Sequence, residues 1–191
     1  RLVCPCFHHP TRGAAEQVTR LRLAGIPVSA AAPRYIRPQD LRRMEPFYPL
    51  QVHHCARCHL VQLEAFETAS AIFEDYAYFS SYSTSWLDHA ARYARMAAER
   101  FALGPRSMVV ELASNDGYLL RNFVAIGVPV LGVEPARNVA AVAVAAGIPT
   151  VSEFFGRETA AALAADGKQA DLLLGNNVLA HVPDLNDFVG D

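Results

Sequence analysis

Four cysteines in the N-terminal third of the sequence have a spacing that suggests metal chemistry. Cys55 and Cys58 enclose two residues in the sequence CARC, between two strand-like apolar runs. This spacing lets two thiolates of one tight turn reach the same tetrahedral ion, so it predicts half of a zinc site. Cys4 and Cys6 are the first choice for the other two ligands, although CxC suits a metal knuckle less well than a second CxxC.

Histidines lie close to these cysteines. Replacement of one cysteine ligand by His8 or His9 is the second choice for the zinc site. We expect His53, His54 and His59 to be surface or packing residues. Thiols that bind no metal remain the alternative interpretation of the whole group.

A second group of polar residues follows a predicted buried strand that ends in Glu111. Ser114, Asn115 and Gly117 come next and precede a predicted helix. Such a turn lets the main chain approach a ligand closely, while the free amides of the helix N-terminus face it. Glu134 ends the following strand, 23 residues after Glu111. A carboxylate there can accept both hydroxyls of an adenosine ribose, so the pattern predicts an adenosine-containing ligand.

Dinucleotides and S-adenosylmethionine (SAM) both present an adenosine. The turn lacks the GxGxxG pattern, in which a glycine lets the pyrophosphate approach the backbone. A ligand without phosphates tolerates Ser114 and Asn115, so the sequence favours SAM over NAD. An ordinary strand-turn-helix without a ligand is the remaining interpretation.

A third predicted strand runs into the sequence GNNVLAHVPDL. Asn176 and Asn177 follow its carboxyl end, which is the ligand edge of an open parallel sheet, so their amides are candidates for holding the cofactor or the substrate. His181 is a weak candidate for a general base, and a histidine that only borders the pocket is the favoured interpretation. Asp184 is expected to cap or turn the chain.

The apolar pattern predicts the elements that position these residues. Residues 86–103 combine good helix formers with apolar residues three and four apart, and Gly104 and Pro105 end this helix. Strands then alternate with helices, and such alternation indicates parallel βαβ units and an α/β, Rossmann-like fold. The predicted order is strand 107–113, helix 117–127, strand 128–135, helix 138–147 and strand 170–179.

The N-terminal third differs from the rest in charge and composition. Residues 1–66 carry a formal charge of +5 and seven prolines, whereas residues 67–191 carry −7. Many prolines and clustered thiols favour a small module that its metal holds together. We therefore expect a zinc-binding module at 1–66, a helical linker over the cofactor site at 67–106, and the first half of a SAM-binding domain at 107–191. The chain stops without a closing element, so we expect a fragment of a longer protein.

Composition excludes several classes of protein. With 52% hydrophobic and 19% charged residues, the chain is not a disordered tail, and its net charge of −2 disfavours a nucleic-acid partner. The longest apolar run has ten residues, whereas a membrane span needs about 20, so no membrane partner is expected. No secretion signal is evident, and four cysteines then fit a reducing compartment, so the expected location is cytoplasmic.

Four segments resemble consecutive blocks of class I SAM-dependent methyltransferases: ELASNDGYLLRNF, LGVEPARNVA, AGIPTVSEFFG and DLLLGNNVLAHVPDLNDFV. They are similar specifically to sugar C-methyltransferases that act on nucleotide-linked 4-keto-deoxysugars. YPLQVHHCARCHLVQL and YAYFSSYSTSW resemble the zinc-binding module of that family and the linker that reaches over its cofactor. The resemblance runs from about Tyr48 to Asp191. It implies zinc in the first module, SAM in the second, a nucleotide-linked sugar substrate, and a further C-terminal domain that closes on the sugar.

The resemblance also implies which residues contact the cofactor. The set combines the linker block with the strand-end blocks: Tyr76, Ser81, Glu111, Ala113, Ser114, Asn115, Gly117, Tyr118, Glu134, Pro135, Asn176, Asn177 and His181. The sequence departs from the family's pattern in three places. Ala113 stands where the family usually has glycine, His59 occupies the usual knuckle glycine, and the first cysteine pair is compressed.

The family's mechanism is implied only in outline. A proton beside the keto group would be removed, and the resulting enolate would attack the methyl group of SAM. In the family the proton-transfer residues lie after the NNVLAHVPD block, so no catalytic base is assigned here, and we expect the chain to bind SAM but to turn over poorly alone. Two alternatives stay open: a zinc-ribbon and Rossmann-like binding protein without catalysis, and an NAD-dependent oxidoreductase.

Overall fold

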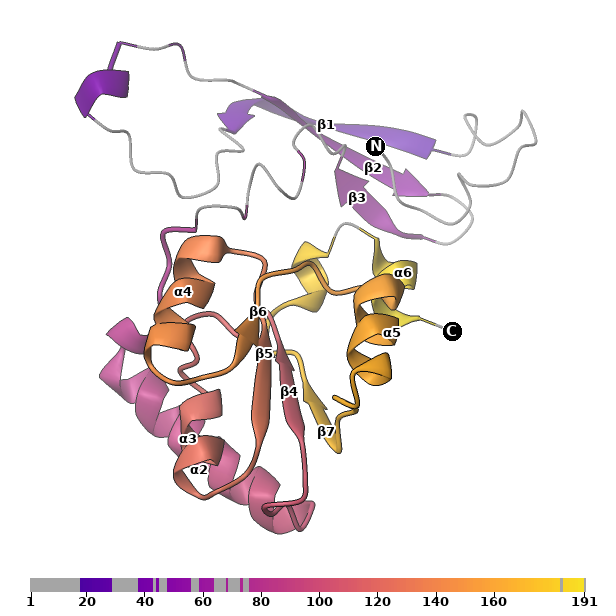
Figure 1. Cartoon of the computed structure of the whole chain (residues 1–191). Coiled ribbons are helices and arrows are strands. Elements are labelled where there is room, and N and C mark those ends of the chain that lie inside the picture. Colours follow the sequence, from indigo (N-terminus) through magenta and orange to yellow (C-terminus); the bar gives the residue numbers. More distant parts are fainter. Residues whose placement is uncertain are drawn as a thin grey trace. The chain divides into compact units, whose positions relative to one another are not determined.

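The chain divides into two compact units, Arg1–Ile72 and Phe73–Asp191. The structure is a computed structural model (Figure 1), and it describes residues 18–28, 38–42, 44, 48–55, 59–63, 68, 73, 76–182 and 184–190. The expected division at residues 66 and 106 stays a prediction. The helix that the sequence assigned to a linker belongs to the second unit.

The first unit contains an antiparallel sheet with the strand order β1-β2-β3. Its elements are β1 (Val18–Val28), the 3₁₀ turn η3 (Pro38–Asp40), β2 (Tyr48–Cys55) and β3 (Val61–Leu63). The two strands expected around the cysteine turn are β2 and β3. Strand β1 was not predicted, because the many prolines of the region suggested only short extended pieces. Its pairing with β2 is irregular between Arg22 and Pro27, where a proline withholds a backbone donor.

The second unit is built on a parallel sheet with the strand order β6-β5-β4-β7. The strands are β4 (Val109–Leu112), β5 (Val130–Val133), β6 (Thr150–Val151) and β7 (Leu172–Leu174). The α/β fold class predicted from the sequence is therefore correct. From β4 the chain moves outward to β5 and β6, and then returns to the other side of β4 for β7. In such sheets the ligand crevice lies at the carboxyl ends of the strands beside this reversal.

Helices cover both faces of this sheet (Figure 1). They are α2 (Thr84–Arg100), α3 (Leu120–Ala125), α4 (Arg137–Ala145), α5 (Arg157–Ala165) and α6 (Leu185–Val189), with the 3₁₀ turns η4 (Ser80–Tyr82) and η5 (Leu179–His181). Along β4 the side chains alternate between two cores. Val109 packs with residues of α2, α3 and α4, whereas Val110 and Leu112 pack with Phe155 and Phe188 near α5 and α6.

Two local features adjust the predicted boundaries. Helix α2 begins at Thr84, two residues before the predicted start, because the Ser83 hydroxyl accepts a hydrogen bond from the Trp86 amide and caps it. Helix α3 begins at Leu120 and not at Gly117, because Asn115 and Gly117 adopt left-handed backbone angles. In the part of the chain that the structure describes, we find no helix of the length and apolarity that a membrane crossing requires.

Candidate functional site

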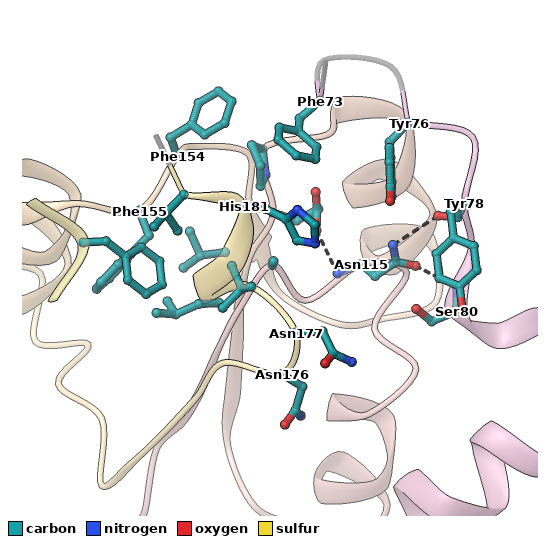
Figure 2. A pocket seen from close by; sticks show the side chains of 18 of the residues that line it. Phe73, Tyr76, Tyr78, Ser80, Asn115, Phe154, Phe155, Asn176, Asn177 and His181 are labelled. Atoms are coloured by element: carbon teal, nitrogen blue, oxygen red, sulfur yellow. Dashed lines mark hydrogen bonds between the residues drawn. The ribbon is translucent and has the colours of Figure 1, made fainter. Parts of the chain in front are cut away.

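A cavity of about 370 Å³ opens at the carboxyl ends of β4, β5 and β7. It lies where the strand order reverses, as expected for a ligand site in an open parallel sheet. Nine of the thirteen predicted cofactor residues line it: Tyr76, Ala113, Asn115, Tyr118, Glu134, Pro135, Asn176, Asn177 and His181. Figure 2 shows Asn115, Asn176, Asn177 and His181 around this space. The fold therefore brings together residues from four separate segments.

The other four predicted residues lie outside the cavity lining. Glu111, Ser114 and Gly117 are buried in β4 and the turn that follows it. Ser81 lies in η4, where its backbone amide and its hydroxyl both donate to the Asp116 carboxylate. These four residues support the turn around the cavity and have no place in the cavity wall.

The turn after β4 has an unusual backbone. Ala113, Asn115 and Gly117 have φ angles of +53°, +52° and +76°. A left-handed conformation is costly for alanine, and strain of this kind gathers at functional sites because the surrounding structure must enforce it. Gly117 also has no room for a side chain, because an added Cβ would lie 2.9 Å from Cγ1 of Ile148. Glycine is therefore required at position 117 for both conformation and space.

Glu134 fixes the position of this turn. Its Oε2 accepts a hydrogen bond from the Asn115 amide at 2.9 Å, and its Oε1 accepts one from the Ala136 amide at 2.8 Å. Burial raises the pKa of Glu134, and the two backbone amides oppose that rise by stabilising the anion. A carboxylate offers about four acceptor positions, so about two remain for a ligand in the cavity that Glu134 lines.

Two further carboxylates are buried beside Glu134. Glu111 is 1% exposed and Asp116 is 2% exposed. Burial, followed by the charges of Glu134 and Asp116, raises the pKa of Glu111 well above its ordinary value. The site therefore favours a protonated carboxyl at Glu111, and it concentrates negative potential beneath the turn.

Aromatic side chains make up much of the cavity wall, and the sequence did not predict most of them. Besides Tyr76 and Tyr118, the wall includes Phe73, Tyr78, Trp86, Phe154, Phe155 and Phe188. Trp86 stacks on Tyr118 with ring centroids 6.0 Å apart, and Phe155 meets Phe188 edge to face at 5.5 Å. The alternation of aromatic residues in YAYFSSY was the available signal for this wall.

The loop after β7 supplies the remaining polar groups. Asn177 has a φ angle of +55°, and His181 in η5 lies 6.4 Å from Phe73 between ring centroids. The Asp184 carboxylate accepts from the amides of Asn186 and Asp187 and caps α6, which confirms its predicted capping role. His181 borders the cavity, which is the placement that the sequence favoured.

The predicted zinc ligands are mostly outside the described residues. Cys4, Cys6 and Cys58 fall there, as do His8 and His9. Cys55 is buried at the end of β2, where the Cys55 amide donates to the Leu60 carbonyl at 3.0 Å. Among the described residues, no three His, Cys, Asp or Glu side chains gather closely enough to hold a metal. The predicted ligand set therefore stays a prediction.

The amino-acid sequence is similar to one protein family and to one characterised protein. Residues 14–73 match a family described as "Putative zinc binding domain". The chain is also 34% identical over 145 residues to the C-methyltransferase NovU of Streptomyces niveus, which corresponds to 76% of this chain and 34% of NovU. The chain therefore spans about a third of the length of this relative.

Solved structures resemble the chain over about half of its length. Magnesium protoporphyrin IX methyltransferase from Synechocystis PCC 6803, solved with bound SAM, has a TM-score of 0.38 and 17% identity, covering 52% of this chain and 46% of that one. YcgJ from Bacillus subtilis has a TM-score of 0.26 and 12% identity, covering 47% of this chain and 30% of YcgJ. The two sequence matches, to a zinc-binding domain family and to part of a C-methyltransferase, are the similarities on which the proposed function draws.

Proposed function

We propose that the second unit binds SAM and supplies the methyl-donor part of a C-methyltransferase. The observation that carries the proposal is Glu134, a buried carboxylate that lines the cavity at the carboxyl end of the strand next to β4. Two of its acceptor positions are taken by backbone amides, and the remaining two match the two hydroxyls of a ribose. The likeness to NovU supports the same reading.

The rest of the cavity suits an adenosyl group. Its apolar and aromatic wall offers faces for stacking a purine, and about 370 Å³ lies within the range of roughly 300–1,000 Å³ found for small-molecule sites. SAM supplies an electrophilic methyl group when bound. The chain's own contribution would be to hold the donor, to orient it, and to exclude water with Tyr76, Tyr78 and the phenylalanines of the wall.

For the acceptor, we propose a nucleotide-linked keto-deoxysugar, and we place the reaction in the cytoplasm. NovU is named a C-methyltransferase, and the four sequence blocks resemble enzymes of that substrate class. The imidazole of His181 lines the cavity, and we assign it to the cavity wall and not to proton transfer. We therefore expect isolated residues 1–191 to bind SAM and to transfer its methyl group poorly or not at all.

Zinc is proposed to hold the first unit together. The matched zinc-binding family begins at residue 14, so its range includes Cys55 and Cys58 but not Cys4 or Cys6. Strand β2 ends at Cys55 and pairs with β3, and the Cys55 amide and carbonyl bond to Leu60 and His59, which suits one half of a metal knuckle. Cys4 and Cys6 remain our first choice for the other ligands, with His8 or His9 as the alternative.

Calorimetric titration of the full chain with SAM, NAD and a short oligonucleotide tests the proposed function. We expect SAM to bind with one molecule per chain, and the other two to give no saturable heat. NAD has an adenosine but also a pyrophosphate, so it is the matched control for the turn without GxGxxG. Saturable binding of NAD without SAM would favour an oxidoreductase, and binding of the oligonucleotide alone would favour a module without catalysis.

A further inference from the structure

Residues 76–79 lie outside the helices and strands and lead into η4, and we call residues 76–82 the strap. Backbone outside helices and strands must find partners for its amides and carbonyls elsewhere, because unpaired buried groups are costly. Here the partners are side chains from the turn that follows β4 and from the first turn of α4. Figure 2 shows one such case, in which the Asn115 side chain bonds to the strap beside Tyr78 and Ser80.

Asn138 binds both backbone groups of a single strap residue. Its Oδ1 accepts from the Tyr76 amide at 3.0 Å, and its Nδ2 donates to the Tyr76 carbonyl at 2.7 Å. The two residues are 62 positions apart in the sequence. Asn138 is the second residue of α4, a helix packed in the core, so the amide that holds Tyr76 is itself attached to a rigid element.

Asn115 and Asp116 hold the next strap residues in the same manner. Asn115 Nδ2 donates to the Tyr78 carbonyl at 3.1 Å, and its Oδ1 accepts from the Ser80 amide at 2.8 Å. Asp116 Oδ2 accepts from the Ser81 amide at 3.1 Å. The strap is thus attached along its length to the edge of the sheet that carries the cavity.

These attachments decide which side chains face the cavity. In an extended segment alternate residues point the same way. Tyr76, Tyr78 and Ser80 all line the cavity, and the Tyr76 ring lies 5.8 Å from Phe73 and 6.4 Å from Tyr78 between centroids. Asn115 lines the cavity too, so its loss would remove a direct contact as well as a support. Asn138 does not line it, and its side chain bonds to Tyr76, so we expect its effect on a ligand to pass through Tyr76.

We infer that Asn138 is a positioning residue, which holds Tyr76 against the cavity and so sets the affinity for the ligand there. The inference rests on the proposed function in naming SAM as that ligand. It also makes a claim about the protein alone, namely that the Asn138 side chain protects the Tyr76 amide from solvent.

The test uses the full chain and two measurements on Asn138→Ala and Asn138→Asp. Amide hydrogen exchange followed by NMR reports on the Tyr76 amide without any ligand, and calorimetry reports SAM affinity. We expect Asn138→Ala to raise the exchange rate at Tyr76 by about tenfold or more, and to weaken SAM binding by about fivefold to tenfold, the scale of one or two lost hydrogen bonds. Asn138→Asp keeps the acceptor for the Tyr76 amide, so its exchange rate should rise less.

Ser107→Ala is the control. Its hydroxyl accepts a hydrogen bond from the Gly104 amide in the loop before β4, and neither residue lines the cavity, so neither measurement should change by more than about twofold. A double-mutant cycle distinguishes an effect of Asn138 through Tyr76 from a general loss of stability. In a Tyr76→Ala background, Asn138→Ala should weaken SAM binding by less than about twofold, because its effect has already been removed.

Two results would overturn the inference. An unchanged exchange rate at Tyr76 in Asn138→Ala would show that the side chain does not hold the strap. Full additivity with Tyr76→Ala, or unchanged SAM affinity in Asn138→Ala, would show that the attachment does not position Tyr76 for the ligand. Wild-type chain that fails to bind SAM would refute the proposed function instead, and the exchange data would still decide whether Asn138 holds the strap.

Discussion

Replacement of Glu134 by glutamine changes one oxygen of a cavity carboxylate into an amino group. In the wild-type protein both carboxylate oxygens accept from backbone amides, those of Asn115 and Ala136. The glutamine side chain keeps one oxygen as an acceptor for one of these amides, but its NH₂ group faces the other, so two donors oppose each other. One buried N–H loses its partner, and such a loss costs about 1–3 kcal/mol. We therefore expect the free energy of unfolding of Glu134→Gln to fall by about 1–3 kcal/mol.

The same substitution should weaken SAM binding, because the replaced oxygen also offers an acceptor position to the ribose. A loss of about 1–3 kcal/mol corresponds to a dissociation constant about fivefold to 150-fold higher. Urea unfolding and calorimetry measure the two effects. Glu99→Gln, an exposed site in the last turn of α2, should stay within about 0.5 kcal/mol of wild type. If Glu134→Gln matched Glu99→Gln in both assays, our reasoning about Glu134 would be wrong.

Three other predictions concern Glu111, Gly117 and the proposed zinc site. Burial raises the pKa of Glu111 above 4.5, so the protonated carboxyl is favoured by the fold, and the unfolding free energy should decline as pH rises from about 4.5. Glu111→Gln should reduce that decline in urea titrations between about pH 4 and pH 8, and an unchanged slope would contradict the assignment. Gly117→Ala should cost more stability than Gly127→Ala, because both glycines have positive φ but only Gly117 lacks room for a Cβ; equal melting temperatures would contradict this. Chelation of the metal should make the first unit more susceptible to limited proteolysis. Protein purified without chelator should contain zinc by elemental analysis, and the absence of bound metal would contradict this prediction.

The sequence was sufficient to predict three strands of the parallel sheet, β4, β5 and β7, and one edge of the cavity, for a physical reason. In a buried parallel sheet the apolar run ends where the strand ends, so Glu134 after β5 and Asn176 after β7 mark the carboxyl edge, whereas Glu111 lies within β4. Spatial proximity then follows from parallel topology alone, because all carboxyl ends meet at one edge. Ala113, Asn115, Glu134, Pro135, Asn176 and Asn177 line the cavity for this reason, whereas Tyr76 was expected only from the family resemblance.

The sequence could not predict what depends on contacts between distant segments. Strand β6 has two residues, too few for a periodic pattern, and α5 is an alanine-rich helix whose apolar side is hard to recognise. Residues 76–79 of the strap lie outside the helices and strands, and the strap's bonds to Asn115 and Asn138 span 35 to 62 residues. Phe154 and Phe188 reach the cavity only because α5 and α6 close over one face of the sheet.

A crystal structure of the chain with S-adenosylhomocysteine, the product left by the methyl donor, would show whether Glu134 holds the ribose. We expect the ligand to occupy the cavity at the carboxyl ends of β4, β5 and β7, with both ribose hydroxyls within about 3.2 Å of the Glu134 carboxylate. A ribose bound elsewhere in the cavity, with the Glu134 oxygens bonded only to the amides of Asn115 and Ala136, would contradict it.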